Sequence, residues 1–375
     1  MNFELSEEQQ LIQDSVARFV QDNYGLEARA ELAGKDPGFS KANWQTMAEL
    51  GWLALPFTEA DGGFGGNQID VMVIMEQFGK GLLLEPYLAS VVMGGGALKR
   101  GASAAMREEI IPGVIDGSHQ LSLAYAESQS RFDLHDVTTT ARADGDHFVI
   151  NGAKSVVLNA ATASHIVVST RTSGGQIDES GISLFLVKAD ADGLSREDYP
   201  TVDGLRASEL TLKDVRVGAD RLIGEADKGY EILNATANDA ILALAAEAVG
   251  AMEILYKDTV AYTQDREQFG HPLSDFQVLQ HRMVDMFMEY EQCKSMLYRA
   301  TMEAVAGDPE SAQRSIHAQK HIVGKYGIFI GEIAVQLHGG MGMTEELRVG
   351  HYLKSMLVID SQFGKDDYHL QNLAA

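Results

Sequence analysis

Two short stretches combine charged, aromatic and glycine residues in a way that suits ligand binding. The first is DREQFGHPLSDFQ, residues 265–277, in which Arg266 stands close to Phe269 and a glycine. A guanidinium binds phosphate oxygens, and an exposed aromatic ring can stack on a flat ring system. The second is QLHGGMGM, residues 336–343, where glycines let a ligand approach the backbone and Gln336 supplies a donor and acceptors. Each alone also fits a helix end plus a turn, but together they predict a ligand site.

A third stretch, VIDSQFGKDDYHL at residues 358–370, surrounds Phe363 and Gly364 with three aspartates. It raises the question of a catalytic carboxylate. Asp360 is three positions before Phe363, so the two are neighbours only if this segment is helical. Aspartates in such stretches are usually solvated or cap helices, and we expect that here.

Other polar features favour structural roles. DGGFGG, residues 61–66, lacks the preceding strand and following Lys-Ser/Thr of a phosphate loop, so it predicts a tight loop with positive φ. His338 beside a glycine pair favours helix termination or a backbone contact over catalysis. His317 and His321 are four residues apart, but no third ligand is evident, so we predict no metal site.

The elements that must position these residues change type twice along the chain. Apolar periodicity predicts helices first, opening at a capping box on Ser6 and continuing around 42–50, 68–80, 86–99 and 103–115. β-branched runs then predict strands at 147–152, 165–171, 182–188 and 209–217, with a bulge near Asp214. Long helices return from Gly229, and a stripe on one of them is expected to be core or subunit interface: Val278, Met283, Met286, Phe287, Tyr290 and Cys293.

This order predicts an α+β, mostly α fold with three domains. We expect an N-terminal helical domain over 1–118, a middle β-barrel or sandwich domain over 119–225, and a C-terminal four-helix-bundle domain over 226–375.

Composition excludes several classes of function. The formal net charge of −24 argues against a nucleic-acid partner. The sequence contains no run of 18 apolar residues, so we expect no membrane span. The acidic N-terminus has no secretory pattern. Cys293 is the single cysteine, which excludes an internal disulfide and predicts a cytoplasmic protein.

R-E-Q-F-G followed by F-Q, and then Q-L-H-G-G-M-G-M-T-E, resembles the acyl-CoA dehydrogenase family over essentially the whole chain. The resemblance is closest to small-subunit proteins of the pimeloyl-CoA dehydrogenase type. It implies FAD bound between two subunits, dehydrogenation across Cα–Cβ of an acyl-CoA, and an electron-transfer flavoprotein as acceptor. A glutamate removes the α-proton in this family. The subunit type further suggests a bulky or ω-carboxylated acyl-CoA, as in lipid or steroid side-chain catabolism.

The family residues that hold the far end of the neighbouring subunit's FAD are all present in this chain. These residues are Arg266, Gln268, Phe269, Gln277, Gln336, Gly339 and Gly340. We refer to them as the trans half-site.

The positions that line a subunit's own flavin depart from the family pattern. Ala126 replaces a threonine that bonds the flavin ring, and Phe132 replaces a serine. Val156 stands where a ring-stacking tryptophan is usual, and Leu158 where a threonine is.

Neither family position for the catalytic glutamate carries a carboxylate. Counting from the glycine pair, one position falls on Phe363, with its following glycine kept as Gly364. Counting back from Gly250, the other falls on Ala240, followed by Ile241 where an arginine is common. The sequence therefore predicts a subunit that completes a partner's flavin site, as in α2β2 heterotetramers, while the partner supplies the base.

Three other interpretations stay open. A homo-oligomeric enzyme could use Asp239 or Asp360 as a substitute base, although one step along a helix rotates Asp239 by about 100° from the family position. The chain could be a non-catalytic binding or regulatory paralogue, although the complete trans half-site argues against that. It could also be a flavoprotein performing another elimination, although the lost ring contacts argue against that.

Overall fold

The computed structural model describes residues 4–374, and residue contacts divide the chain into two compact units. The helical unit contains the residues up to Glu31, Asn67–Leu83, and the chain from Ile241 onward. The sheet unit contains Leu32–Gly66 and Leu84–Ala240. The three predicted domains, with boundaries after residues 118 and 225, are instead consecutive segments of the chain. These boundaries stay a prediction.

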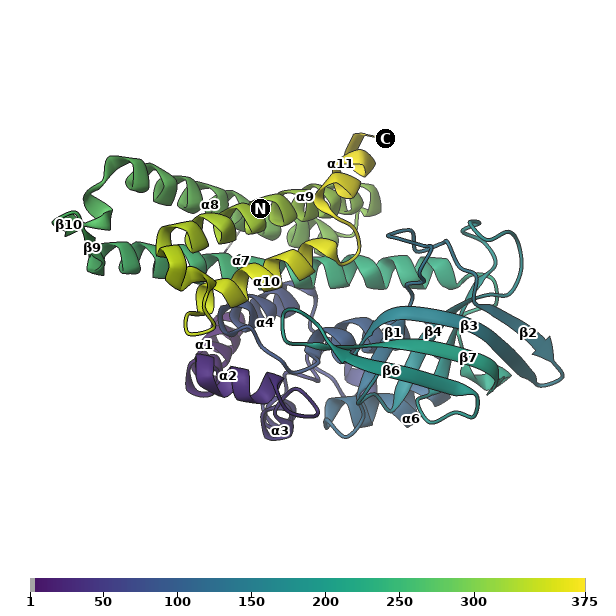
Figure 1. Cartoon of the computed structure of the whole chain (residues 1–375). Coiled ribbons are helices and arrows are strands. Elements are labelled where there is room, and N and C mark those ends of the chain that lie inside the picture. Colours follow the sequence, from purple (N-terminus) through teal and green to yellow (C-terminus); the bar gives the residue numbers. More distant parts are fainter. Residues whose placement is uncertain (1–3, 375) are drawn as a thin grey trace. The chain divides into compact units, whose positions relative to one another are not determined.

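The helical unit is built almost entirely of helices (Figure 1). Ser6 and Gln9 form the predicted capping box: Gln9 N donates to Ser6 Oγ at 3.2 Å, and Ser6 N donates to Gln9 Oε1 at 3.0 Å. The helices assigned wholly or mainly to this unit are α1 Glu7–Asn23, α2 Leu26–Ala33, α4 Gln68–Gly81, α7 Gly229–Asp265, α8 Gln277–Ala306, α9 Pro309–His338, α10 Arg348–Ser361 and α11 Asp366–Ala374.

Two glycines let α4 and α7 cross in direct backbone contact. A Cβ added at Gly79 would lie 1.9 Å from the Glu247 carbonyl oxygen, and one at Gly250 would lie 1.9 Å from the Glu76 carbonyl oxygen. Any larger residue at either position would push the helices apart.

The predicted apolar stripe on α8 divides between the core and the surface. Met283, Met286, Tyr290 and Cys293 follow one another at separations of three, four and three residues and are buried. Val278 and Phe287 are instead 63% and 45% exposed in the single chain, so these two do not share the buried face, and their place in a subunit interface stays a prediction. Phe287 directly follows Met286, and one residue rotates a side chain by about 100° around the helix axis.

The sheet unit contains one large sheet and several short helices. Its strands are β1 Leu121–Ala124, β2 Thr140–Asp144, β3 His147–Leu158, β4 His165–Arg171, β5 Ile182–Lys188, β6 Leu194–Pro200, β7 Arg206–Gly218 and β8 Leu222–Ile223. The order is β6-β7-β3-β2-β4-β5-β8, and β1 pairs with β4 in parallel. The helices are α3 Lys41–Glu49, a π-helix at Leu88–Gly95, α5 Gly96–Gly101 and α6 Ala104–Ile115.

The predicted bulge in β7 is confirmed. Ile150 pairs with Val215 and Gly152 with Leu212, so Asn151 faces the two residues Lys213 and Asp214. Asp214 has a φ of 54°, and its backbone N donates to Asn151 Oδ1 at 2.9 Å. The extra residue lets the apolar side chains on both sides of the bulge reach the same core.

Within residues 4–374, no helix is both long and apolar enough to cross a membrane.

Candidate functional site

The REQFGHP stretch forms a β-hairpin between α7 and α8 (Figure 1). β9 Glu267–Gln268 pairs with β10 His271–Pro272, which leaves Phe269 and Gly270 as a two-residue loop. Their φ angles are 59° and 83°. Positive φ at both central residues is the mark of a type I′ turn, which usually carries Asn-Gly.

The unusual turn residue presents an aromatic ring to solvent. Phe269 is 89% exposed, and its ring lies edge-to-face with Phe276, with the centroids 6.2 Å apart. An aromatic side chain in a left-handed conformation costs free energy, and here that conformation exposes the ring instead of burying it. Such a ring suits stacking on a planar ligand.

The polar members of the trans half-site at this hairpin are accessible. Among the described residues, no ion pair or hydrogen bond engages the Arg266 side chain. The Arg266 carbonyl accepts from Leu273 N at 2.8 Å, which closes the base of the hairpin. Gln268 and Gln277 are both exposed, and Gln277 is the first residue of α8.

The second stretch, QLHGGMGM at residues 336–343, lies against the end of α7. His338, the last residue of α9, stacks on Tyr262 with ring centroids 4.2 Å apart. Tyr262 is one helical turn before Arg266, so the structure brings the two predicted stretches to the same end of α7. His338 Nδ1 also contacts the Ala334 carbonyl at 2.8 Å, which is the structural role expected for it.

The glycine pair after α9 leaves its backbone open. Gly339 has a φ of 62°, and a Cβ added at Gly339 or Gly340 would meet nothing within 4 Å. Gln336 is exposed on the preceding turn. A free guanidinium, an exposed ring, amides and open backbone can together bind an anionic ligand that carries a flat ring.

The positions expected to line the chain's own flavin carry no polar replacement. Ser155 N donates to the Ala126 carbonyl at 2.9 Å, so Ala126 and Val156 lie at adjacent places in the sheet unit. Val156 lies in a second bulge of the β3–β7 pair, this one on β3. It has a φ of 52° and is 53% exposed. A β-branched residue rarely adopts this conformation.

Two residues that sequence reasoning missed hold this bulge. Val156 N donates to Glu209 Oε1 at 3.1 Å, and the Tyr199 hydroxyl donates to the same oxygen at 2.8 Å. Burial opposes ionisation of Glu209, but the bonds from Tyr199, Val156 and Ser155 lower its pKa overall. No spacing signal marks this pair, because β6 and β7 bring Tyr199 and Glu209 to the bulge only through sheet register.

A buried ion pair supports the strands beside the bulge. Lys154 Nζ lies 2.8 Å from Glu127 Oε1 and 2.9 Å from Ser169 Oγ, and both charged side chains are inaccessible. Glu127 also accepts from Thr138 N at 2.9 Å and Thr139 N at 3.1 Å. Burial disfavours the Glu127 carboxylate, but Lys154 and the hydrogen bonds from the side chains of Thr138 and Gln129 lower its pKa to about 2. The pair therefore stays ionised and ties β3 and β4 to the segments that follow β1 and precede β2.

The four candidate base positions are all constrained. Ala240 and Phe363 are buried and apolar. Asp239 forms an ion pair with Arg100 of α5. Asp360 is buried, contrary to a solvated flank, and it caps α11 by accepting from Asp366 N at 3.1 Å.

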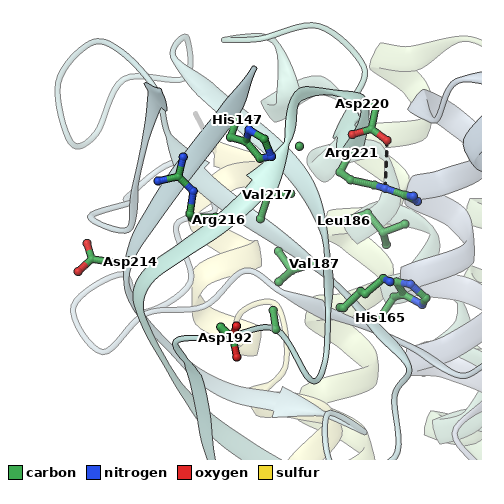
Figure 2. A pocket seen from close by; sticks show the side chains of 13 residues that line it. His147, His165, Leu186, Val187, Asp192, Asp214, Arg216, Val217, Asp220 and Arg221 are labelled. Atoms are coloured by element: carbon green, nitrogen blue, oxygen red, sulfur yellow. Dashed lines mark ion pairs between the residues drawn. The ribbon is translucent and has the colours of Figure 1, made fainter. Parts of the chain in front are cut away.

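A hollow of about 560 Å³ in the sheet unit contains none of the predicted site residues (Figure 2). Its arginines are already paired: Arg216 lies 2.9 Å from Asp144, and Arg221 lies 2.8 Å from Glu109. These neighbouring carboxylates neutralise the cations, so we assign no ligand to the hollow.

Models of three acyl-CoA dehydrogenase domains match the chain in order. The N-terminal domain matches residues 6–118, the middle domain residues 122–215, and the C-terminal domain residues 227–375. The chain belongs to the acyl-CoA dehydrogenase family. The predicted fold class and the predicted oxidoreductase class, acting on a CH–CH bond, are thereby confirmed.

Individual relatives match over nearly their full length. The probable acyl-CoA dehydrogenase YngJ of Bacillus subtilis (strain 168) is 29% identical, over 100% of this chain and 98% of that protein. A solved structure of PigA with FAD and proline is 26% identical with a TM-score of 0.91, over 100% of this chain and 98% of that one. A variant of the Tcur3481-Tcur3483 steroid ACAD is 28% identical with a TM-score of 0.88, over 98% and 97%.

Proposed function

We propose that this chain is an FAD-dependent acyl-CoA dehydrogenase subunit whose trans half-site completes the flavin site of a homologous partner subunit. In this proposal the partner holds the flavin ring and supplies the catalytic carboxylate. The assembly is an α2β2 heteromer in the cytoplasm, and an electron-transfer flavoprotein reoxidises it.

The observation that carries the proposal is the contrast between the two halves of the site. The Arg266 guanidinium and the Phe269 ring are accessible, and the backbone at Gly339 and Gly340 is open. The chain's own side has Ala126 and Val156 where flavin-ring contacts are usual.

The residues of the trans half-site fit FAD chemically. Arg266 would pair with the pyrophosphate, and Phe269 would stack on the adenine. Gln277 and Gln336 would supply hydrogen bonds, and the Gly339–Gly340 backbone would allow close approach. Bound FAD supplies the two-electron acceptor for dehydrogenation of the acyl chain.

The α-proton of an acyl-CoA thioester is weakly acidic, so its removal needs a desolvated carboxylate with a raised pKa and donors to the developing enolate oxygen. Phe363 and Ala240 cannot accept a proton. The carboxylate therefore comes from the partner. The steroid ACAD relative supports a bulky acyl-CoA as substrate, in lipid or steroid side-chain catabolism.

Production of the chain alone and together with a homologous full-length acyl-CoA dehydrogenase subunit tests the proposal. We expect the chain alone to be colourless and inactive, and the complex to bind one FAD per two chains and dehydrogenate acyl-CoA esters. A yellow chain with one FAD per subunit and turnover by itself would overturn the proposal.

The trans contact is tested by Arg266→Ala in the complex. Loss of a charge-assisted bond should weaken FAD retention roughly ten- to hundredfold, measured by equilibrium dialysis of the flavin. Arg314→Ala is the matched control, because Arg314 is also exposed on a helix of the same unit. Equal FAD retention in the two variants would contradict the assignment.

The alternative of a self-sufficient homo-oligomer with a substitute base makes a different prediction. Asp239→Asn or Asp360→Asn should then abolish turnover of the chain alone. A non-catalytic paralogue would bind no FAD either alone or with a partner.

A further inference from the structure

Six polar side chains gather where α9, α10 and α11 meet in the helical unit, and the proposed function uses none of them. We call this group the C-terminal cluster. Its members are His317, Lys320 and His321 on α9, Asp360 on α10, and Asp366 and His369 on α11.

Lys320 is the centre of the cluster. Its side chain is fully buried, and its Nζ donates to the carbonyls of Ile359, Asp360 and Gly364 at 2.8, 2.9 and 2.9 Å. An ammonium has three N–H donors, so each of them is satisfied. Two of these carbonyls belong to the last turn of α10, where the regular helical N–H partners run out. The Ile359 carbonyl also accepts from Gln362 N at 3.3 Å. Lys320 thus caps α10 and holds the turn that follows it.

The two histidines form a directional chain of hydrogen bonds. Gln313 Nε2 lies 2.9 Å from His317 Nε2, His317 Nδ1 lies 2.8 Å from His369 Nδ1, and His369 Nε2 lies 3.1 Å from the Phe363 carbonyl oxygen. The carbonyl can only accept, so His369 Nε2 carries a proton and a neutral His369 accepts at Nδ1. His317 must then donate from Nδ1 and accept the Gln313 amide at Nε2. One set of neutral tautomers satisfies every contact.

The cluster therefore binds two consecutive carbonyls of one strained turn. The Phe363 carbonyl accepts from His369, and the Gly364 carbonyl accepts from Lys320. Phe363 has a φ of 56° and is buried. A bulky residue holds such a conformation only when its surroundings fix it.

We propose that Lys320, His369 and His317 are positioning residues that lock the Phe363–Gly364 turn onto α9, and that the lock requires both imidazoles to be neutral. Acid breaks it because a proton on His369 Nδ1 removes the acceptor for His317 and places a second cation beside Lys320. The turn is the place where relatives carry their base, so the lock sets the direction of side chain 363.

The electrostatics of the surrounding groups support a neutral pair. Burial lowers the pKa of His369 to about 3, with Lys320, His317 and His321 adding to the shift and the Phe363 carbonyl opposing it. Burial also lowers the pKa of His317. Burial lowers the pKa of Lys320 to about 8, and Asp360 and Asp366 oppose that shift. Burial raises the pKa of Asp360, with Lys320 opposing it and smaller contributions from Asp366 and Lys365.

The sign of the pH effect follows from these directions. The unfolded segment takes up a proton on each imidazole near pH 6.5, but the folded cluster does not. The stability that the imidazoles give the lock is therefore complete between about pH 6.5 and the pKa of Lys320 near 8, and it is lost progressively as the pH falls below about 6.5.

Hydrogen–deuterium exchange of the full chain tests the lock without flavin or substrate. We expect protection of residues 358–374, corrected for intrinsic exchange, to fall at least roughly tenfold between about pH 7.5 and about pH 5. In His369→Gln the amide can still donate to the Phe363 carbonyl but does not titrate, so this dependence should disappear. His281→Gln, which removes an exposed histidine from α8, should keep it.

Lys320→Met should lower the protection of the same residues at both pH values, because the carbonyls lose their donors at similar side-chain volume. His317→Gln provides a milder second variant should Lys320→Met fail to fold, and it should flatten the pH dependence as His369→Gln does. Protection in the unaltered chain that is independent of pH, or His369→Gln behaving like the unaltered chain, would overturn the proposal. The outcome does not depend on whether the chain binds FAD.

Discussion

Val156, Phe269 and Phe363 share a left-handed backbone conformation, with φ angles of 52°, 59° and 56°. Sequence resemblance assigned each of these positions to flavin binding or to the catalytic base. It did not predict their backbone conformation, because no local turn signal places a β-branched or aromatic residue at positive φ. Each such residue costs about 1–3 kcal/mol, and together they mark turns whose geometry is held by other parts of the fold.

Phe269→Asn should separate stability from binding. The substitution creates the Asn-Gly pair that type I′ turns prefer, so the free energy of unfolding should rise by about 1 kcal/mol. FAD retention by the complex should fall, because the exposed ring is lost. Chemical denaturation and flavin dialysis check the two effects, and an unstable variant would contradict a strained turn.

Val156→Asn should stabilise the chain by about 1 kcal/mol, because asparagine tolerates positive φ better than valine. Val202→Asn is the control: Val202 is also an exposed valine of the sheet unit, and it is not among the positive-φ residues. Thermal unfolding of both variants is the measurement. An equal change in midpoint would show that exposed apolar area, rather than backbone strain, decides the effect.

At the scale of elements, the sequence predicted the long and strongly patterned segments and missed the short or polar ones. The run ISLFLVK coincides with β5, and the predicted helix over 68–80 corresponds to α4. β6 was missed because LSREDYP is mostly exposed and charged, and α2 because its eight residues carry little apolar pattern. Such elements form through pairing and packing with distant segments, which a local window does not contain.

The Glu127–Lys154 pair links β3 to the segment that follows β1, and its two side chains also bond to β4 and to the residues before β2. Glu127→Gln leaves a buried ammonium without its counter-charge, so we expect a loss of about 3–5 kcal/mol in the free energy of unfolding. The folded-state pKa of Glu127 is lowered to about 2, so its contribution is complete above the ordinary carboxyl range near pH 4.5. It is lost as the pH falls from there toward 2.

Urea unfolding at several pH values measures this contribution. The difference between the unaltered chain and Glu127→Gln should shrink as the pH falls below about 5. Glu225→Gln, which removes an exposed carboxylate paired with Lys228, should leave stability nearly unchanged. A difference that grew as the pH fell would contradict the assigned ionisation.

At the scale of the whole molecule, α8 exposes Val284, Phe287 and Met288 to solvent in the single chain. Three large apolar side chains along one helix are typical of a surface that another subunit covers. We expect Phe287→Glu combined with Met288→Glu to shift the assembly toward smaller species, measured by light scattering after size-exclusion chromatography. Gln292→Glu on the same helix controls for added charge, and unchanged mass in the double variant would exclude α8 from the interface.

The border of the two compact units falls between the consecutive residues Ala240 and Ile241, inside the continuous helix α7. Each unit is also assembled from separated segments of the chain. No single cut in the gene can therefore release either unit, and recombination with an unrelated gene would have to exchange several pieces at once. This offers a reason why YngJ aligns with the whole chain rather than with one part of it. It also means that the chain is inherited as one piece and changes by point substitution. A subunit of such a fold can therefore lose catalytic residues and keep its architecture.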